Sequence, residues 1–359
     1  MISYCTNVHP AEDLPGILAQ LDAYAVPVRE RLGAGRLGVG LWLAAPVARG
    51  LAEDRTARAR LRTELDARGL AVYTLNAFPY GGFHADVVKH AVYRPTWTEA
   101  ARTSYTLDCV TVLTDLLADD AEYGSISTLP LAWREPWSVE DDRRAAAALR
   151  QVTDALRPTP VRLAIEPEPG CVLDTVADAA RWLPRYADLD LVGLCLDTCH
   201  LAVSFADPGH TLSGLDAAGI RVMKVQASAA LHVDAPREQE ARSALAAFDE
   251  PRYLHQVREL AAGGEVLAVD DLPEAEAGLP GDGPWRVHFH LPLHAQPPRP
   301  LRATTDVLTT VLAGLTGDPH VEVETYTWSV LPGEPDLIEG IAAELRWAEE
   351  NLSREGIAS

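Results

Sequence analysis

Short apolar runs alternate along the chain with longer segments in which apolar residues recur every three or four positions. The short runs predict β-strands, and the longer segments, such as the one containing Leu14, Ile17 and Leu21, predict amphipathic helices. Regular alternation of strand and helix favours a parallel sheet, and about eight repeats favour a closed (β/α)8 TIM barrel. The expected strands are Ile2–Thr6, Leu37–Leu43, Leu70–Phe78, Gly124–Leu129, Val161–Glu166, Leu191–Asp197, Arg221–Gln226, Trp285–His290 and His320–Thr325.

The nine predicted strands are one more than the eight of a (β/α)8 barrel. We attribute the additional strand to an insertion. We expect a single barrel domain over residues 1–359, with an insertion at residues 227–300 that forms a hairpin or lid near the barrel mouth. The stretch Pro273–Pro284 within it is rich in Glu, Gly and Pro, which is typical of loops outside a regular barrel. We expect Trp285–His290 to pair with Gly264–Asp270 in that hairpin.

Composition narrows the functional classes. The chain has 359 residues, with 31 Lys and Arg against 52 Asp and Glu, for a net charge of −21. Such a charge repels phosphate backbones and anionic lipid, so we expect neither nucleic-acid binding nor stable membrane insertion. No signal peptide is recognisable, and five scattered cysteines do not suggest a disulfide scaffold, which favours a cytoplasmic location. A homo-oligomer is compatible with these features.

Polar pairs stand at the ends of several apolar strands, where a barrel carries its chemistry. Taken singly, each pair has an ordinary explanation, such as a solvated rim, a structural bridge or an exposed hairpin face. Taken together, so many acids would be costly to bury without a cation, so the set predicts a divalent-metal site for Mn²⁺, Zn²⁺, Fe²⁺ or Mg²⁺. The pairs are Glu166/Glu168, Asp197/His200, Lys224/Gln226, His288/His290 and Glu322/Glu324.

Loops after the early and last strands carry amides, imidazoles and aromatic rings. These groups suit a polyhydroxylated small molecule, although each of them is also common in turns and cores. The candidate substrate contacts are Asn7, His9, Asn76, Tyr80, His84, His288, Tyr326 and Trp328.

The runs LAIEP, LCLDTCH and VEVETYTW resemble the xylose isomerase-like barrels, which include sugar isomerases and epimerases, inosose dehydratases and endonuclease IV. The resemblance implies metal ligands at Glu166, in the Asp197-Thr-Cys-His200 segment and at Glu324. One departure matters: the strand that carries a ligating His in epimerases has Lys224 and Gln226 here. Gln226 could bind weakly, His290 from the insertion could supply the missing imidazole, or the metal could be absent.

The chain is also similar to the EboE-type metabolite traffic proteins of the bacterial ebo cluster. The likeness rests on SYCTNVHP, YTLNAFPYGGFH, GSISTLP, IEPEPG, LDTCH, KVQASAAL, RYLHQ, WRVHFHLP and VEVETYTW, and covers nearly the whole chain. The cluster's other enzymes imply a sugar- or cyclitol-like metabolite of a secondary-metabolite pathway.

The leading hypothesis is a metal-dependent isomerase or epimerase of such a metabolite. Its ligands would come from Glu166, Asp197, Glu324 and His290, with His200 and Gln226 as second choices. Glu166, Glu168, Lys224 and His200 are the candidate catalytic groups, with an acid moving the proton next to a carbonyl. A non-catalytic small-molecule binding or trafficking protein is one alternative. An endonuclease IV-like metallohydrolase is another, which the acidic charge disfavours.

Overall fold

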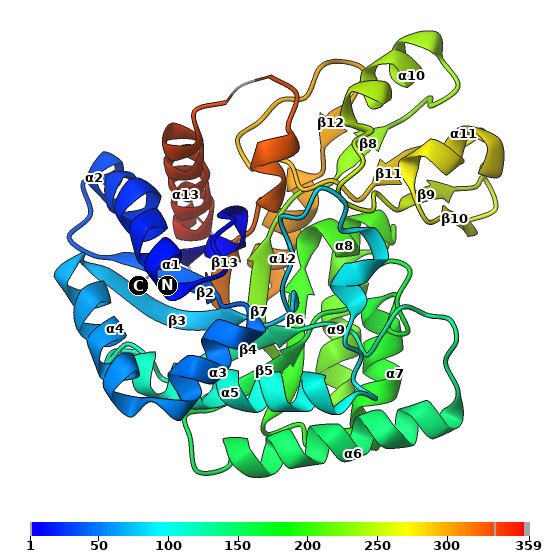
Figure 1. Cartoon of the computed structure of the whole chain (residues 1–359). Coiled ribbons are helices and arrows are strands. Elements are labelled where there is room, and N and C mark those ends of the chain that lie inside the picture. The colour runs from blue at the N-terminus through cyan, green and yellow to red at the C-terminus, as the bar shows by residue number, and fades with distance from the viewer. Residues whose placement is uncertain (1, 334, 355–359) are drawn as a thin grey trace.

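A computed structural model describes residues 2–333 and 335–354 of the chain. Eight parallel strands close into a barrel in the order β1-β13-β7-β6-β5-β4-β3-β2, which confirms the predicted TIM barrel (Figure 1). The barrel strands are β1 Ile2–Cys5, β2 Leu37–Trp42, β3 Leu70–Asn76, β4 Gly124–Thr128, β5 Val161–Ile165, β6 Val192–Asp197, β7 Val222–Ala227 and β13 His320–Val323.

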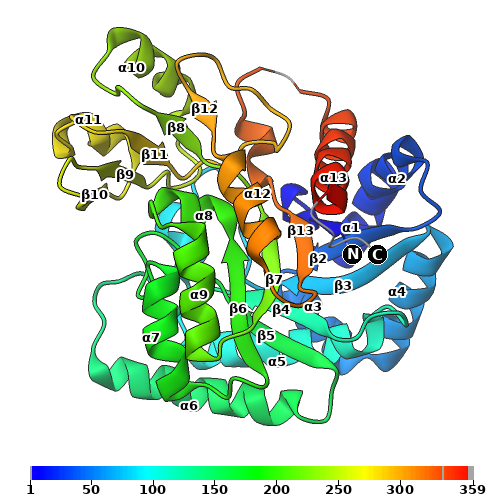
Figure 2. The same ribbon diagram turned by 180° about the vertical axis from the view of Figure 1, so that it is seen from behind.

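Helices cover the outside of the barrel, because each strand of a parallel sheet is reached through a crossover. Figure 2 shows α7, α9 and α12 packed beside one another over β6 and β7. The helices are α1 Leu14–Gln20, α2 Val26–Leu32, α3 Ala45–Glu53, α4 Arg55–Ala67, α5 Ala100–Leu116, α6 Val139–Leu156, α7 Val176–Tyr186, α8 Thr198–Val203, α9 Pro208–Ala218, α10 Gln239–Leu245, α11 Ala275–Gly278, α12 Thr305–Gly314 and α13 Leu337–Arg354.

The barrel strands are predominantly apolar because their two faces lie against the interior and the helices. All six residues of β2 and all six of β6 are buried, for example. Helix starts follow from local sequence too. At the start of α6, Ser138 caps the backbone N–H of Asp141, and the Asp141 side chain accepts from the Ser138 N–H.

A second sheet is formed by the chain segment between β7 and α12. In space it lies beyond the barrel ends of β6 and β7 (Figure 1). It has five strands in the order β10-β9-β11-β8-β12 and its own apolar core, which includes Phe248, Trp285 and Phe289. The strands are β8 Leu231–Val233, β9 Val257–Leu260, β10 Val266–Val269, β11 Trp285–Val287 and β12 Arg302–Ala303.

The predicted hairpin between Trp285–His290 and Gly264–Asp270 is wrong. Strand β9 separates the two, pairing antiparallel with β10 on one side and with β11 on the other. The sequence of β9, Val-Arg-Glu-Leu, does not indicate a buried strand, because two of its four residues are charged. The partners that satisfy the buried Glu259 come from distant parts of the chain. Glu259 accepts hydrogen bonds from the backbone N–H groups of Gly281, Asp282 and Gly283 and from the indole of Trp285.

Strand β11 also stops at Val287, earlier than predicted, so His288 and His290 follow the strand as irregular backbone. All five cysteines are buried free thiols. Within the described ranges, no helix is long and apolar enough to cross a membrane.

Candidate active site

Three buried carboxylates meet where β5, β6 and β13 end. Glu166 follows β5, Asp197 is the last residue of β6, and Glu324 follows β13. The side chains are nearly inaccessible to solvent, and a ligand oxygen from each lies within 4.8 Å of the others. This spacing is close enough for all three to bind one cation.

Neighbouring polar groups fix the orientation of two of these carboxylates. Asn7 and Asn76 each donate a side-chain N–H to Oε1 of Glu324, at 2.7 and 2.9 Å. Oδ1 of Asp197 accepts from the backbone N–H of His200 and from the Ser228 hydroxyl, each at 2.8 Å. One oxygen of each carboxylate is thereby held, which leaves the second available to a ligand.

The acids oppose one another's ionisation. Burial, followed by repulsion from Glu324 and Asp197, raises the pKa of Glu166 well above its usual value. Burial and then Asp197 and Glu322 raise the pKa of Glu324 in the same direction. A cation between them would reverse this penalty by favouring the charged forms.

His200, His288 and His290 enter the same space with their ring orientations fixed. Nδ1 of His200 lies 2.9 Å from the Pro167 carbonyl oxygen, Nδ1 of His288 lies 2.6 Å from Oε1 of Gln256, and Nδ1 of His290 lies 2.8 Å from the Glu324 carbonyl oxygen. Each partner is an acceptor, so each Nδ1 carries the proton and each neutral ring turns an unprotonated Nε2 inward.

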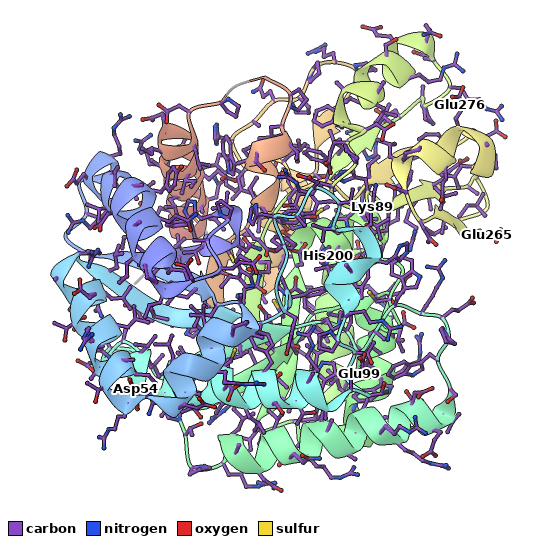
Figure 3. The ribbon with its side chains drawn as sticks, viewed as in Figure 1. Asp54, Lys89, Glu99, His200, Glu265 and Glu276 are labelled. Carbon is purple, nitrogen blue, oxygen red and sulfur yellow. The ribbon has the colours of Figure 1, made fainter. Side chains whose placement is uncertain are left out.

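Burial keeps these rings neutral. It lowers the pKa of His200 to about 4 and lowers the pKa values of His288 and His290 as well. Neutral imidazole is the form that ligates metal ions. Figure 3 shows His200 in the interior of the molecule near Lys89, whereas Glu265 and Glu276 lie on the periphery of the inserted unit.

Glu168 lies in the same cavity with a different set of partners. Its Oε1 accepts from the Tyr93 hydroxyl at 2.7 Å and from the Gln256 side chain at 3.3 Å. Burial raises the pKa of Glu168 to about 8, although both hydrogen bonds act in the opposite direction. At neutral pH this carboxyl holds a proton that it can give up, as a general acid requires.

Lys224 and Gln226 project from β7 but do not line the cavity. Lys224 Nζ contacts Glu322 at 2.6 Å and donates to the Ser127 hydroxyl at 3.2 Å. Burial opposes its charge, yet the attraction of Glu322 raises the pKa of Lys224 overall, so it stays protonated and cannot serve as a base. The side-chain amide of Gln226 finds no hydrogen-bond partner among the described residues.

The predicted substrate contacts divide into two groups. Asn7, Asn76, His288 and Tyr326 line the cavity. The other four do not line the cavity. His9 stacks on Tyr24, and Tyr80 packs on Tyr105. The His84 ring reaches the Asn7 carbonyl oxygen, and the Trp328 indole donates to Glu344.

Sequence reasoning missed several cavity residues. Phe78, Phe83, Val88, Lys89, Val92, Tyr93, Tyr253 and Leu254 all line it, and Gln256 and Ser228 position its acids. Gln256 lies in the RYLHQ motif and Ser228 in the KVQAS motif. The polar residues of these motifs could therefore have indicated that both side chains belong to the site.

The cavity's chemistry fits a divalent metal. Across residues 2–333 and 335–354, buried polar atoms without hydrogen-bond partners include Glu166 Oε2, Asp197 Oδ2 and His290 Nε2. His290 Nε2 and Asp197 Oδ2 lie 3.9 Å apart, which two ligands of one ion span when each bond is about 2.0–2.2 Å. Unsatisfied buried acceptors are costly. The ligand atoms of Glu166, Asp197 and Glu324 lie within 4.8 Å of one another, as do those of Asp197, His200 and His290, so Asp197 belongs to both groups that could hold a cation.

Residues 34–258 match the protein family described as "Xylose isomerase-like TIM barrel". No curated protein matches the chain. Among solved structures, a xylose isomerase-like TIM barrel protein from Mycobacterium smegmatis in complex with magnesium is 13% identical, with 99% of this chain and 97% of that chain covered and a TM-score of 0.58.

Two epimerase structures are similar as well. An L-ribulose 3-epimerase is 14% identical, with 99% of this chain and 95% of that chain covered and a TM-score of 0.56. A D-psicose 3-epimerase, solved in the presence of D-fructose, is 13% identical, with 98% of this chain and 99% of that chain covered and a TM-score of 0.53. At these identities the likeness establishes a shared fold.

Proposed function

Because this chain belongs to the xylose isomerase-like TIM barrel family, and because three buried carboxylates converge at its barrel mouth, we propose that it is a metal-dependent isomerase or epimerase. Its substrate would be a sugar- or cyclitol-like metabolite. The observation that carries the proposal is the convergence of Glu166, Asp197 and Glu324, each ending or following a different barrel strand.

The ligands of the metal would be these three carboxylates together with Nε2 of His290. In this arrangement the inserted segment supplies the imidazole that β7 lacks, because β7 offers Gln226 in its place. When bound, a divalent ion supplies Lewis-acid polarisation of a substrate carbonyl.

The chain's own groups would handle the proton and the hydroxyls. Burial raises the pKa of Glu168 in the metal-free cavity, and a divalent cation bound nearby would lower it again. The Glu168 carboxylate can then take the proton from the carbon next to the carbonyl and return it. Oδ1 of Asn7 is buried without a partner among the described residues and can accept from a substrate hydroxyl. Tyr326 would form an apolar wall against the ring.

Two further lines support this substrate class. The structural neighbours include proteins named L-ribulose 3-epimerase and D-psicose 3-epimerase, which are sugar epimerases by name. The motif resemblance to EboE-type proteins supports a role in a secondary-metabolite pathway of the ebo type.

Hydrogen exchange tests the reaction directly. The Mn²⁺-loaded protein would be incubated in D₂O with free ketoses and inososes, and NMR would follow deuterium at the carbon next to the carbonyl. We expect exchange by the wild type and at least about a hundredfold slower exchange by Glu168→Gln, in keeping with loss of a general acid–base group. Absence of exchange by a protein that retains its metal would contradict the proposed reaction.

The alternative of a binding or trafficking protein has one specific observation in its favour. Gln226 replaces the ligating His of the related epimerases, and an amide oxygen binds metal more weakly than an imidazole does. Tight binding of a panel sugar without deuterium exchange would favour this alternative.

A further inference from the structure

The charges around the cavity bear on the class of substrate that it can admit. Glu166, Glu168 and Glu324 line the cavity, and a ligand oxygen of Asp197 lies within 4.8 Å of those of Glu166 and Glu324. A divalent ion held by Glu166, Asp197 and Glu324 would bring two positive charges against three negative ones. An anionic group on the substrate would therefore meet repulsion from this part of the site.

Lysine and arginine contribute little to the cavity wall. Lys89 is the one lysine among the described residues that line the cavity, and none of these lining residues is an arginine. Lys89 Nζ lies 2.5 Å from Oδ2 of Asp271. Asp271 is itself fixed, because its Oδ1 accepts from the backbone N–H groups of His255 and Leu272, at 3.0 and 3.1 Å. The charge of Lys89 is therefore already balanced by an acid of the chain.

Backbone N–H groups of the loop after β7 are committed as well. In (β/α)8 barrels a phosphate group is frequently held by the loops after the seventh and eighth strands, which are β7 and β13 here. The N–H of Ser228 donates to the Thr198 hydroxyl at 3.1 Å, and the N–H of Ala230 donates to the Thr304 hydroxyl at 2.8 Å. Side chains of the protein thus accept the hydrogen bonds that a phosphate would need from this loop.

The loop after β13 meets a buried carboxylate of the protein itself. It leads through Thr325 into a short 3-10 helix, Tyr326–Val330. Glu344 of α13 lies beside the first turn of that helix, where its Oε1 accepts from the Thr325 hydroxyl at 2.6 Å and its Oε2 accepts from the Trp328 indole at 3.0 Å. A phosphate bound at this turn would lie close to an acid of the same charge.

The segments that cover the mouth contribute mostly apolar and aromatic groups to the cavity. These lining residues, from the loop after β3 and from the inserted unit, are Phe83, Val88, Val92, Tyr253 and Leu254. The Tyr253 hydroxyl already donates to the Phe83 carbonyl oxygen, at 3.2 Å. An ionised group against this wall would lose its hydration and gain no donor, which is far more costly than burying a hydroxyl.

We propose that the substrate is an uncharged polyhydroxy carbonyl compound and that the site excludes phosphate esters of the same sugar. This inference rests on the proposed function and narrows its substrate class. The competing explanation is that Lys89 leaves Asp271 when a substrate enters and binds a phosphate group in its place. The two explanations predict opposite preferences between a sugar and its phosphate ester.

Matched pairs of ketoses test the proposal. The full-length protein, with Mn²⁺ in excess, would be incubated in D₂O with D-fructose or D-fructose 6-phosphate, and with D-ribulose or D-ribulose 5-phosphate. NMR would follow deuterium at the carbon next to the carbonyl. We expect the wild type to exchange the free ketose at least about tenfold faster than its ester, because like charges in a desolvated site repel strongly. The ratio of the two rates within one protein cancels differences in folding and metal content.

Two neighbouring aspartates provide a variant and its control. Asp271→Asn keeps an acceptor for the two backbone N–H groups but leaves the charge of Lys89 unpaired at the cavity, so the preference for the free ketose should fall at least about threefold. Asp270→Asn is the matched control, because Asp270 pairs with Arg134 at 2.6 Å and should leave the ratio unchanged. Equal ratios in the two variants would overturn the part assigned to the Lys89–Asp271 pair.

Lys89→Met separates the two explanations. The proposal expects this variant to favour the free ketose at least as strongly as the wild type does. A wild type that exchanges the ester as fast as the free ketose or faster, with this preference lost in Lys89→Met, overturns the inference and leaves the proposed function standing. Exchange of neither compound by a protein that retains its metal overturns the proposed function, and this inference falls with it.

Discussion

Lys224 and Glu322 form an ion pair at 2.6 Å inside the barrel, and neither side chain has any exposed surface. The pair lies beneath the carboxylates of the site, where the lysine charge lowers the pKa values of both Glu166 and Glu324. Lys224 therefore offsets part of the negative charge that the site concentrates, which is a structural role for a residue that the sequence places among the candidate catalytic groups.

Loss of this lysine should be costly. Lys224→Met leaves Glu322 buried without its cation, and removing one partner of a buried pair typically costs about 3–5 kcal/mol of unfolding free energy. Urea denaturation measures the unfolding free energy of the wild type and the variant. The double variant Lys224→Met/Glu322→Gln removes the uncompensated charge and should recover part of the loss. A single variant within about 0.5 kcal/mol of wild type, the usual range for neutral surface changes, would contradict the pair's importance.

Gly40 on β2 should tolerate no side chain. A Cβ there would lie 1.3 Å from Oε1 of Glu322 and 2.9 Å from Cγ2 of Thr74, so Gly40→Ala must displace the buried pair. We expect a severe loss of soluble protein or a large fall in Tm. The control is Gly214→Ala within α9, where a Cβ meets nothing within 4 Å and alanine should stabilise by roughly 0.5–1 kcal/mol. Equal Tm values for the two variants would contradict this account.

Asp197 should be indispensable for binding of the metal ion proposed at the three carboxylates. Asp197→Asn keeps an acceptor for the His200 N–H and the Ser228 hydroxyl but removes the charge, so we expect the proposed metal ion to be lost. Wild-type Tm should fall on addition of chelator, because bound metal stabilises the native state by mass action, and the variant's response should be smaller. The exposed Glu265→Gln serves as the control. A chelator response in Asp197→Asn equal to that of the wild type would argue against the site.

The metal-free protein should lose the stability that Glu168 contributes as the pH rises from 6.5 to about 8, with little further change from this group at pH 9. Folded Glu168 has a pKa of about 8, whereas an unfolded glutamate titrates near 4.3. Its raised pKa contributes stability that is complete below the unfolded value and disappears as the pH passes the folded value. The buried histidines have lowered pKa values and remain neutral across most of this window.

Calorimetry at pH 6.5, 7.5 and 9 measures this dependence in chelator-treated protein. Glu168→Gln has no proton to lose at that position, so its Tm should vary less with pH. A wild-type Tm that falls with pH no more than that of the variant would refute the assignment.

DNA should not bind at physiological salt. The net charge of −21 repels a phosphate backbone, so a polarisation titration with an abasic-site duplex should show neither binding at micromolar protein nor strand cleavage. Specific cleavage would instead promote the metallohydrolase alternative.

The barrel could be predicted from sequence because its strands are apolar runs with turn residues between them, and this local pattern survives folding. Strand β9 could not, since the burial of Glu259 depends on backbone N–H groups more than twenty residues away. The site shows the same division. Glu166, Asp197 and Glu324 stand at strand ends and were predictable, whereas Tyr93 and Gln256 reach Glu168 only through the packing of a long loop against the inserted sheet.

That packing also closes the site. The backbone N–H groups of Val88 and Lys89 both donate to the Arg252 carbonyl, and Lys89 Nζ contacts Asp271 at 2.5 Å. These contacts join the loop after β3 to the inserted unit at the mouth of the barrel. The cavity that remains is about 60 Å³, far below the roughly 300–1,000 Å³ of typical ligand pockets. A substrate of the proposed sugar-like class would enter only after these contacts break, so the frequency of that opening would set an upper bound on turnover, however fast the chemistry inside.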